Sequence, residues 1–275
     1  MSEQTDRYER FTETNVVGSL IIYEWAASLD ISGARDILDR IVEVLGSAPD
    51  IATVTDEKTG KDYLYRNFAK RDVITKKDWQ SVGYLWKRSP NVLSDFSIDI
   101  GCSVDRFRLF EIHIDRAANA DAKKTFERII KLLVQELQPI YGVGLSMPYS
   151  WGPRAFARGS TSSRFATVDK TFYGPPEQLR AQSFVFGRTF HARSDERHLD
   201  VNLRDVFPFN LLSQGHLDRR IDRKRLQNWI LDNAYGVLRQ LSPVSWRWDV
   251  PPEDIQKIRK FLIDAGITIV KEQPS

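Results

Sequence analysis

The chain has 275 residues, with 40 Lys and Arg against 37 Asp and Glu and a formal net charge of +3. Hydrophobic residues make up 41% and charged residues 28%, a globular composition that excludes wholesale disorder. No run of about 18 apolar residues occurs, and the polar residues 1–10 do not resemble a signal peptide. The single cysteine, Cys102, allows no internal disulfide. We therefore expect a cytoplasmic protein without a membrane partner.

The first half of the chain predicts the element order β-α-β-β-α-β after a polar tail at residues 1–15. The expected elements are a strand at 16–29, a helix from Ser32 as N-cap to Gly46, a hairpin of 96–100 with 107–115, a helix at 119–138 and a strand at 143–145. The stretch 47–94 is harder to interpret. Short strands at 51–54 and 63–65 are the elements it favours.

The carboxyl-terminal end repeats the same order. Its expected elements are a strand at 199–203, a helix at 223–234, a hairpin of 237–241 with 246–250, a helix after Pro251-Pro252 and a strand at 267–270. We therefore predict an α+β protein of two split-βαβ (ferredoxin-like) halves, 16–146 and 199–271, with antiparallel sheets packed together. Leu133, Ile258 and Leu262 lie on the apolar stripes of helices, so we expect them to be buried.

The connector between the halves, residues 147–198, has an unusual composition. It carries eight Lys and Arg against four Asp and Glu, a net charge of +4, and nine aromatic residues in 52. A structureless loop of this length is uncommon in a compact protein, so we expect it to pack on the sheets or to form a functional surface. Arginine and aromatic residues are enriched at protein–protein hot spots, and they also bind phosphates and stack on bases.

Three His-x-Asp triplets could contribute chemistry: 113–115, 198–200 and 216–218. The two polar residues of such a triplet share one face of a strand, as a metal site or an acid–base pair requires. The alternative is that they are solvent-facing positions of amphipathic strands. We favour this alternative, because the chain has four histidines and no cysteine cluster. We therefore expect the triplets to lie apart, with no metal, no cofactor and no catalytic residue.

A second pattern places Asp99 and Glu111-Ile-His113 on neighbouring strands of the predicted hairpin. Metal-dependent nucleases use a similar Asp…Glu-x-Lys layout, in which two carboxylates hold a divalent ion. Here His113 replaces the lysine and the order of elements differs, so charged residues on an open sheet face are the simpler interpretation. Gly142-Val-Gly144 follows a helix instead of opening one, and it does not predict a nucleotide site.

Several segments resemble a known group of proteins. They are Leu203–Leu217, Trp246-Arg-Trp-Asp-Val-Pro with the later Ala265-Gly-Ile, Tyr141-Gly-Val-Gly and Gly152–Gly159. Together they resemble uncharacterised bacterial immunity-like proteins associated with type VI secretion and polymorphic toxins. The resemblance covers roughly the carboxyl-terminal half and implies a cytoplasmic protein that binds and blocks a cognate toxin. It carries no catalytic residues.

We therefore expect a non-enzymatic protein whose partner is another protein, a toxin-like effector. The expected partner-binding residues are Tyr149, Trp151, Arg154, Arg158, Arg204 and Phe207. The first alternative is a nucleic-acid-binding or nuclease-like protein of a bacterial defence system. A metal-dependent enzyme built on the His-x-Asp triplets is the second.

Overall fold

The computed structural model describes residues 16–56, 60–68, 79–86, 96–102, 108–115, 122–148, 153–157 and 197–269. We call residues 16–148 the amino-terminal lobe and residues 197–269 the carboxyl-terminal lobe. The amino-terminal lobe contains β1 (Val16–Trp25), α2 (Ile31–Leu45), β2 (Ile51–Asp56), β3 (Gly60–Leu64), α3 (Tyr65–Phe68), β4 (Trp79–Trp86), β5 (Phe96–Cys102), β6 (Arg108–Asp115), α4 (Ala122–Glu136) and β7 (Pro139–Pro148). A short helix, α5 (Pro153–Ala157), follows.

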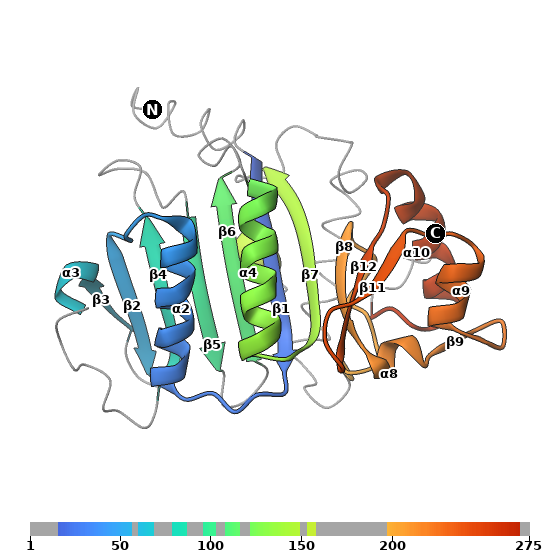
Figure 1. The fold of residues 1–275 in the computed structure, drawn as a ribbon, viewed down its shortest axis with the longest axis horizontal. Coiled ribbons are helices and arrows are strands. Elements are labelled where there is room, and N and C mark those ends of the chain that lie inside the picture. The colour runs from blue at the N-terminus through green and yellow to red at the C-terminus, as the bar shows by residue number, and fades with distance from the viewer. Residues whose placement is uncertain are drawn as a thin grey trace.

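The carboxyl-terminal lobe contains β8 (Phe209–Ser213), α8 (Gln214–Leu217), β9 (Arg220–Ile221), β10 (Lys224–Arg225), α9 (Leu226–Asp232), β11 (Val237–Gln240), β12 (Ser245–Asp249), the 3-10 helix η3 (Pro252–Asp254) and α10 (Ile255–Asp264). Strands of both lobes join in one sheet with the order β11-β12-β8-β7-β1-β6-β5-β4-β2-β3 (Figure 1). Neighbouring strands in it are antiparallel. The predicted α+β class with antiparallel strands is confirmed.

The amino-terminal lobe has the strand arrangement that a split-βαβ unit requires. β7, which follows the second long helix, pairs with β1, and the β5–β6 hairpin pairs with the other side of β1. Helices α2 and α4 lie side by side on one face of this sheet (Figure 1). β2, β3 and β4 extend the sheet beyond β5, and β4 was not predicted. Asp30, not Ser32, is the N-cap of α2, because its carboxylate accepts a hydrogen bond from the Gly33 amide.

Apolar residues cover both faces of the sheet. On the helix-covered face, Leu20, Ile112 and Leu133 belong to one core cluster. On the other face, Ile21 and Val143 pack with residues of the carboxyl-terminal lobe, including Ile258 and Leu262. Leu133, Ile258 and Leu262 have no exposed surface, as their helical spacing predicts. No helix among the described residues is long and apolar enough to cross a membrane.

The carboxyl-terminal lobe corrects two of the predicted strands. Residues 199–203 were expected to form a strand, but most of them form a turn, in which Asn202 N–H donates to His198 O at 2.7 Å. Within 199–203, only Leu203 forms a β-bridge, and it pairs in parallel with Thr268. The described part of the predicted strand 267–270 likewise contains no β-pairing other than this bridge. The strand that enters the sheet is β8, further along the chain. Apolar and polar residues alternate at 199–203 because one side of the turn is buried, and not because these residues pair with a neighbouring strand.

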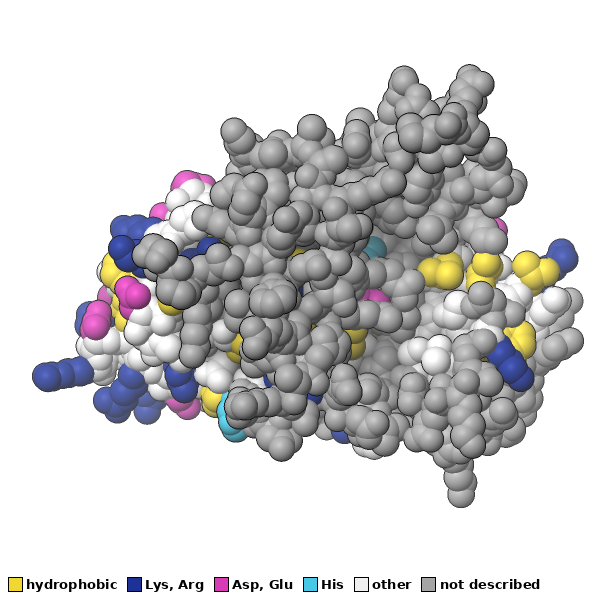
Figure 2. Space-filling model, turned by 180° about the vertical axis from the view of Figure 1, so that it is seen from behind, with side chains coloured by type: hydrophobic (Ala, Val, Ile, Leu, Met, Phe, Trp, Pro, Cys, Tyr) yellow, Lys and Arg dark blue, Asp and Glu magenta, His cyan; other side chains and the backbone are white. Residues whose placement is uncertain are grey.

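The basic run Arg219–Arg225 forms the tight β9–β10 hairpin. Asp222 and Arg223 have φ values of 48° and 70°, as both central residues of a type I′ turn do. Lys224 and Arg225 are exposed and form ion pairs with neighbouring aspartates. Basic and acidic side chains alternate at this end of the molecule, at the left in Figure 2. The interpretation of this run as a solvated surface is confirmed.

Candidate protein-binding site

Two of the predicted partner-binding residues are buried, which corrects their assignment. Arg204 has no exposed surface; its guanidinium donates to the Tyr23 hydroxyl and lies 3.8 Å from the centre of the Phe156 ring. Phe207 is equally buried and packs edge-on against Phe156. Loop composition alone could not show that these side chains point inward. Both stabilise the core behind the sheet and are not accessible to a partner at the surface.

The other predicted residues of this group are not tested by the structure. Tyr149, Trp151 and Arg158 lie outside the described residues. Arg154 belongs to α5, but its side chain is outside the described part. Their role in binding stays a prediction.

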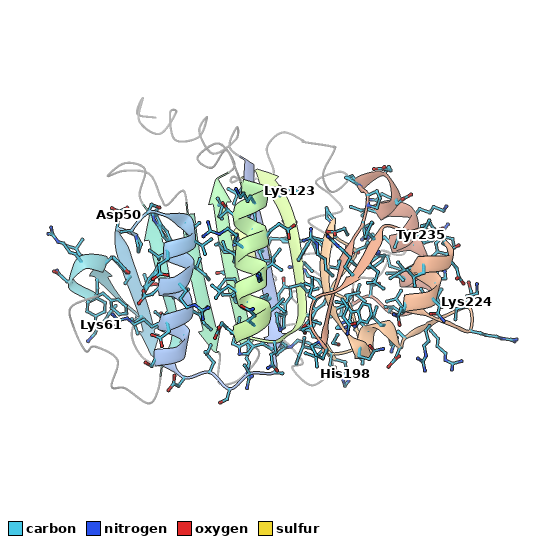
Figure 3. The ribbon with its side chains drawn as sticks, viewed as in Figure 1. Asp50, Lys61, Lys123, His198, Lys224 and Tyr235 are labelled. Atoms are coloured by element: carbon cyan, nitrogen blue, oxygen red, sulfur yellow. The ribbon has the colours of Figure 1, made fainter. Side chains whose placement is uncertain are left out.

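The three His-x-Asp triplets lie in different environments. His198 is exposed next to α8, at the opposite edge of the molecule from Lys123 in Figure 3. His113 and His216 are both buried, so the expectation that His113 faces solvent is wrong. Among the residues that the structure describes, no three His, Cys, Asp or Glu side chains converge as metal ligands would.

His113 is the centre of a buried polar chain. Its Nδ1 lies 2.8 Å from Ser19 Oγ on β1, and its Nε2 lies 3.3 Å from Glu111 Oε2 on its own strand. This order of hydroxyl, imidazole and carboxylate is the one that activates a nucleophile. Ser19 is only 3% exposed and Glu111 is not exposed, so these side chains are almost wholly buried, although Ser19 also borders the pocket described below. These hydrogen bonds therefore satisfy the polar side chains of the three residues within the core.

Asp99 and Glu111 were predicted to lie on adjacent strands, and this is confirmed: the two residues are paired opposite each other in β5 and β6. Ser19 was not predicted. It interrupts the apolar run of β1 and faces His113 in register, which is the sequence signal that could have identified it.

His216 caps its own helix. Its Nδ1 accepts a hydrogen bond from the Ser213 amide at 3.1 Å, and its ring stacks on Tyr141 with 5.2 Å between centres. Burial lowers the pKa of His216 to about 4. The ring is therefore neutral at physiological pH and serves the packing of α8 against β7.

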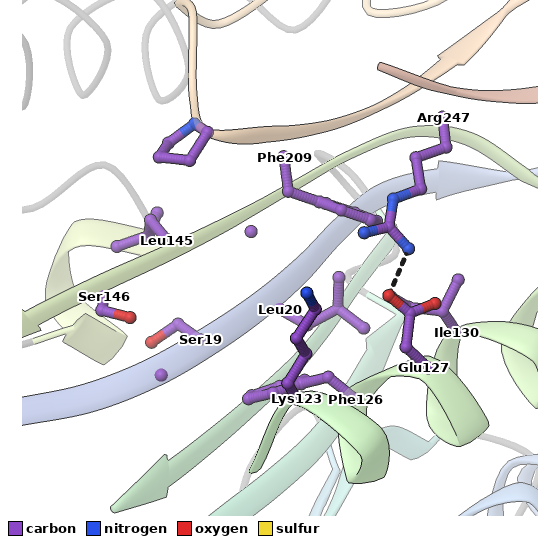
Figure 4. Close-up of a pocket in the computed structure, with 13 residues that line it drawn as sticks. Ser19, Leu20, Lys123, Phe126, Glu127, Ile130, Leu145, Ser146, Phe209 and Arg247 are labelled. Atoms are coloured by element: carbon purple, nitrogen blue, oxygen red, sulfur yellow. Dashed lines mark hydrogen bonds and ion pairs between the residues drawn. The ribbon is translucent and has the colours of Figure 1, made fainter. Parts of the chain in front are cut away.

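An open pocket of about 200 Å³ lies where the two lobes meet on the helix-covered face (Figure 4). Its apolar lining residues are Leu20, Phe126, Ile130, Leu145, Pro208 and Phe209. The rest of the lining comes from three charged residues, Lys123 and Glu127 of α4 and Arg247 of β12, and from Gly18, Ser19, Gly144 and Ser146 of β1 and β7. Lys123 lies at the first turn of α4 and extends toward the pocket. Apolar walls with a few oriented polar groups are the usual makeup of a binding site.

Arg247 is held in one position by three contacts. Its Nη1 lies 2.6 Å from Glu127 Oε1, its Nε lies 2.7 Å from Asp249 Oδ1, and its guanidinium lies 4.8 Å from the centre of the Phe209 ring. Burial disfavours the charged form of Arg247, but the hydrogen bonds to Glu127 and Asp249 outweigh that effect and raise its pKa. The pocket is therefore preformed.

Two glycines permit the strand pairing behind this pocket. β7 and β8 pair over only three residues, including Gly142 opposite Leu211 and Gly144 opposite Phe209. A Cβ at Gly142 would lie 2.9 Å from the backbone oxygen of Ile21, and one at Gly144 would lie 2.9 Å from the Phe209 ring. The Gly-Val-Gly pattern therefore serves the junction of the lobes, not a nucleotide.

A second hollow of about 510 Å³ continues along α4 toward the β11–β12 turn. It shares Glu127 and Ile130 with the first pocket, so the two hollows adjoin, and we call them together the α4 groove. The second part is lined by Lys124, Glu127, Arg128, Ile130, Lys131, Val134, Gln135 and Leu241. The helix periodicity predicted α4, but the groove depends on how the lobes meet and could not be predicted from it.

The fold and the groove define a two-lobed α+β protein with a preformed surface depression. No protein-family model matches the chain, and no curated protein matches it either. Among solved structures, it is similar to the Pseudomonas aeruginosa type VI secretion system (T6SS) protein PA0821, with a TM-score of 0.59 and 11% sequence identity. The match covers 98% of this chain and 82% of that one. At this identity the likeness shows a shared fold.

Proposed function

We propose that this chain is a non-enzymatic protein-binding protein that neutralises a cognate toxin of a type VI secretion system. The observation that carries the proposal is the α4 groove, a preformed depression with apolar walls and charged residues at the junction of the lobes. Buried aromatic and arginine groups next to such a pocket are typical of interfaces that accept an anchor side chain. The similar fold of a T6SS protein supports the same class of system.

The proposed site of action is the cytoplasm, where an immunity protein would meet an incoming or newly made toxin. Trp151 and Arg154 of the connector remain proposed partner-binding residues. The Ser19–His113–Glu111 chain has no part in the proposal, because its side chains are almost wholly buried.

Expression of the gene next to this one tests the proposal. If the neighbouring gene encodes a toxin, its expression alone should arrest growth, and co-expression of this chain should restore it. The matched control is co-expression of an unrelated α+β protein at the same level. Growth arrest that this chain does not relieve, or a neighbouring product with no toxicity in any compartment, would contradict the proposed function.

A further inference from the structure

The exposed side of α4 carries a stripe of like charges. Lys124, Arg128 and Lys131 follow one another at spacings of four and three residues, and each is exposed. Like charges at these spacings repel one another and destabilise a helix. The arrangement is therefore unfavourable for folding alone and is consistent with a role in binding.

The acidic residues of α4 do not neutralise this stripe. Glu127 pairs with Arg247 at 2.6 Å, and Glu136 pairs with Arg40 at 2.5 Å. Within the described residues, Lys124, Arg128 and Lys131 form no ion pair. Along this wall of the groove, no ion pair with another described residue compensates the positive charge.

The floor and the opposite wall of the groove are aliphatic. Ile130 and Val134 lie beneath the stripe, and Leu241, which is 36% exposed, faces it from the turn between β11 and β12. Val244 of the same turn is 47% exposed. A ligand that fits must therefore present both apolar and negatively charged groups.

We propose that the α4 groove binds an acidic, amphipathic segment of a partner protein. Aliphatic side chains in the groove would pack against the apolar side of the segment, and the three cations would pair with its carboxylates. A nucleic acid fits less well beside the cationic stripe, because the lining of that part of the groove includes no aromatic ring on which a base could stack and it includes Glu127. The proposal rests on the proposed function in so far as the partner is taken to be the toxin.

The test uses two synthetic helical peptides of the same length. The first is amphipathic, with Leu along one side of the helix and Glu along the other, and the second has Gln in place of every Glu. Binding is measured by fluorescence anisotropy at low and physiological salt. The wild-type protein should bind the Glu peptide at least tenfold more tightly than the Gln peptide, with the difference shrinking as salt rises. Failure to bind the Glu peptide at about 1 mM would overturn the proposal.

Charge reversal then locates the binding site. Lys124→Glu combined with Lys131→Glu should weaken binding of the Glu peptide more than tenfold, and Leu241→Asp should weaken binding of both peptides. The matched control reverses two exposed cations outside the groove, Lys61 on β3 and Lys260 on α10, and should leave the affinity unchanged. Circular dichroism checks that each variant is folded. Equal losses in the groove and control variants would overturn the proposal.

If the neighbouring gene encodes a toxin, that toxin separates this proposal from the proposed function. If wild-type protein binds the toxin and the Lys124→Glu, Lys131→Glu variant binds it equally well, the groove is not the docking site although the proposed function stands. If no form binds the toxin, the proposed function fails while the peptide result still decides the chemistry of the groove. A single-stranded oligonucleotide is tested in the same way. If it binds more tightly than the Glu peptide and the same charge reversal abolishes its binding, the ligand of the groove is a nucleic acid and the proposal is overturned.

Discussion

Arg247 of β12 donates to Glu127 of α4 across the junction of the lobes, with 2.6 Å between Nη1 and Oε1. The two residues are 120 positions apart in the chain. Because Arg247 also bonds Asp249 and lies over Phe209, this contact joins α4 to β12 at the lining of the first pocket, next to Glu127, which both parts of the α4 groove share. The stability of the lobe junction and the shape of the groove are therefore linked.

Removal of this contact should destabilise the protein. Arg247→Ala should lower the free energy of unfolding by about 2 kcal/mol, because charge-assisted hydrogen bonds to a poorly exposed guanidinium are lost. Urea denaturation monitored by tryptophan fluorescence measures the change. Arg239→Ala is the control: its ion pair with Asp249 is at the surface, and its loss should cost less than about 1 kcal/mol. Equal costs for the two variants would contradict the role given to Arg247.

The glycines of β7 should resist even a small side chain. Gly144→Ala should destabilise the protein by about 1–3 kcal/mol because the added methyl overlaps the Phe209 ring. The double variant with Phe209→Ala should recover part of that loss, because it removes the ring carbons that the added methyl meets. Gly142→Ala should not be rescued by the same change, since its methyl meets the backbone oxygen of Ile21. Rescue of both variants, or of neither, would show that the strand junction is packed differently.

His216 should make stability depend on pH. Its pKa is about 4 in the folded protein against 6.5 in the unfolded chain, so the unfolded chain binds a proton first as the pH falls. The stabilising contribution is complete above pH 6.5 and is lost as the pH falls toward 4. We expect a loss of about 2 kcal/mol between pH 7.5 and pH 5 from this residue.

Comparison with His216→Asn isolates this effect from other titrating groups. The variant should be less stable at pH 7.5, because the ring stacked on Tyr141 is lost, but it should lose less stability on acidification. Urea denaturation at the two pH values provides both numbers. A variant with the same pH dependence as the wild type would exclude His216 as the cause.

Arg204 should behave as a core residue and not as a binding residue. Arg204→Ala leaves a cavity between Tyr23 and Phe156 and removes a buried hydrogen bond, so we expect a loss of about 3–5 kcal/mol in the free energy of unfolding. Thermal unfolding measures it. If the Arg204→Ala variant is folded with normal stability but no longer binds the partner, Arg204 is a binding residue and its assignment to the core is contradicted.

The sequence predicted the elements whose signals are local. The apolar spacing of α4, the alternation of β5 and β6 and the left-handed Gly46 at the end of α2 all matched the structure. The strand expected at 199–203 failed because a turn with one buried side also alternates in hydrophobicity. Position in a loop suggested exposure for Arg204, whose burial depends on Tyr23 and Phe156, both far away in the sequence.

The groove has a similar origin. Lys124, Arg128 and Lys131 could be placed on the outer face of a helix, but the apolar wall opposite them comes from Leu241, more than a hundred residues later. Only the pairing of β8 with β7 brings that turn beside α4.

A salt titration of binding tests the central claim most directly. Purified protein is titrated by calorimetry with the inactivated product of the neighbouring toxin gene, and separately with generic DNA and RNA, at several salt concentrations. The account predicts a 1:1 protein complex that persists at physiological salt, because desolvated anchors contribute more than screened charges. Tight nucleic-acid binding with a steep salt dependence, and no complex with the toxin, would contradict it.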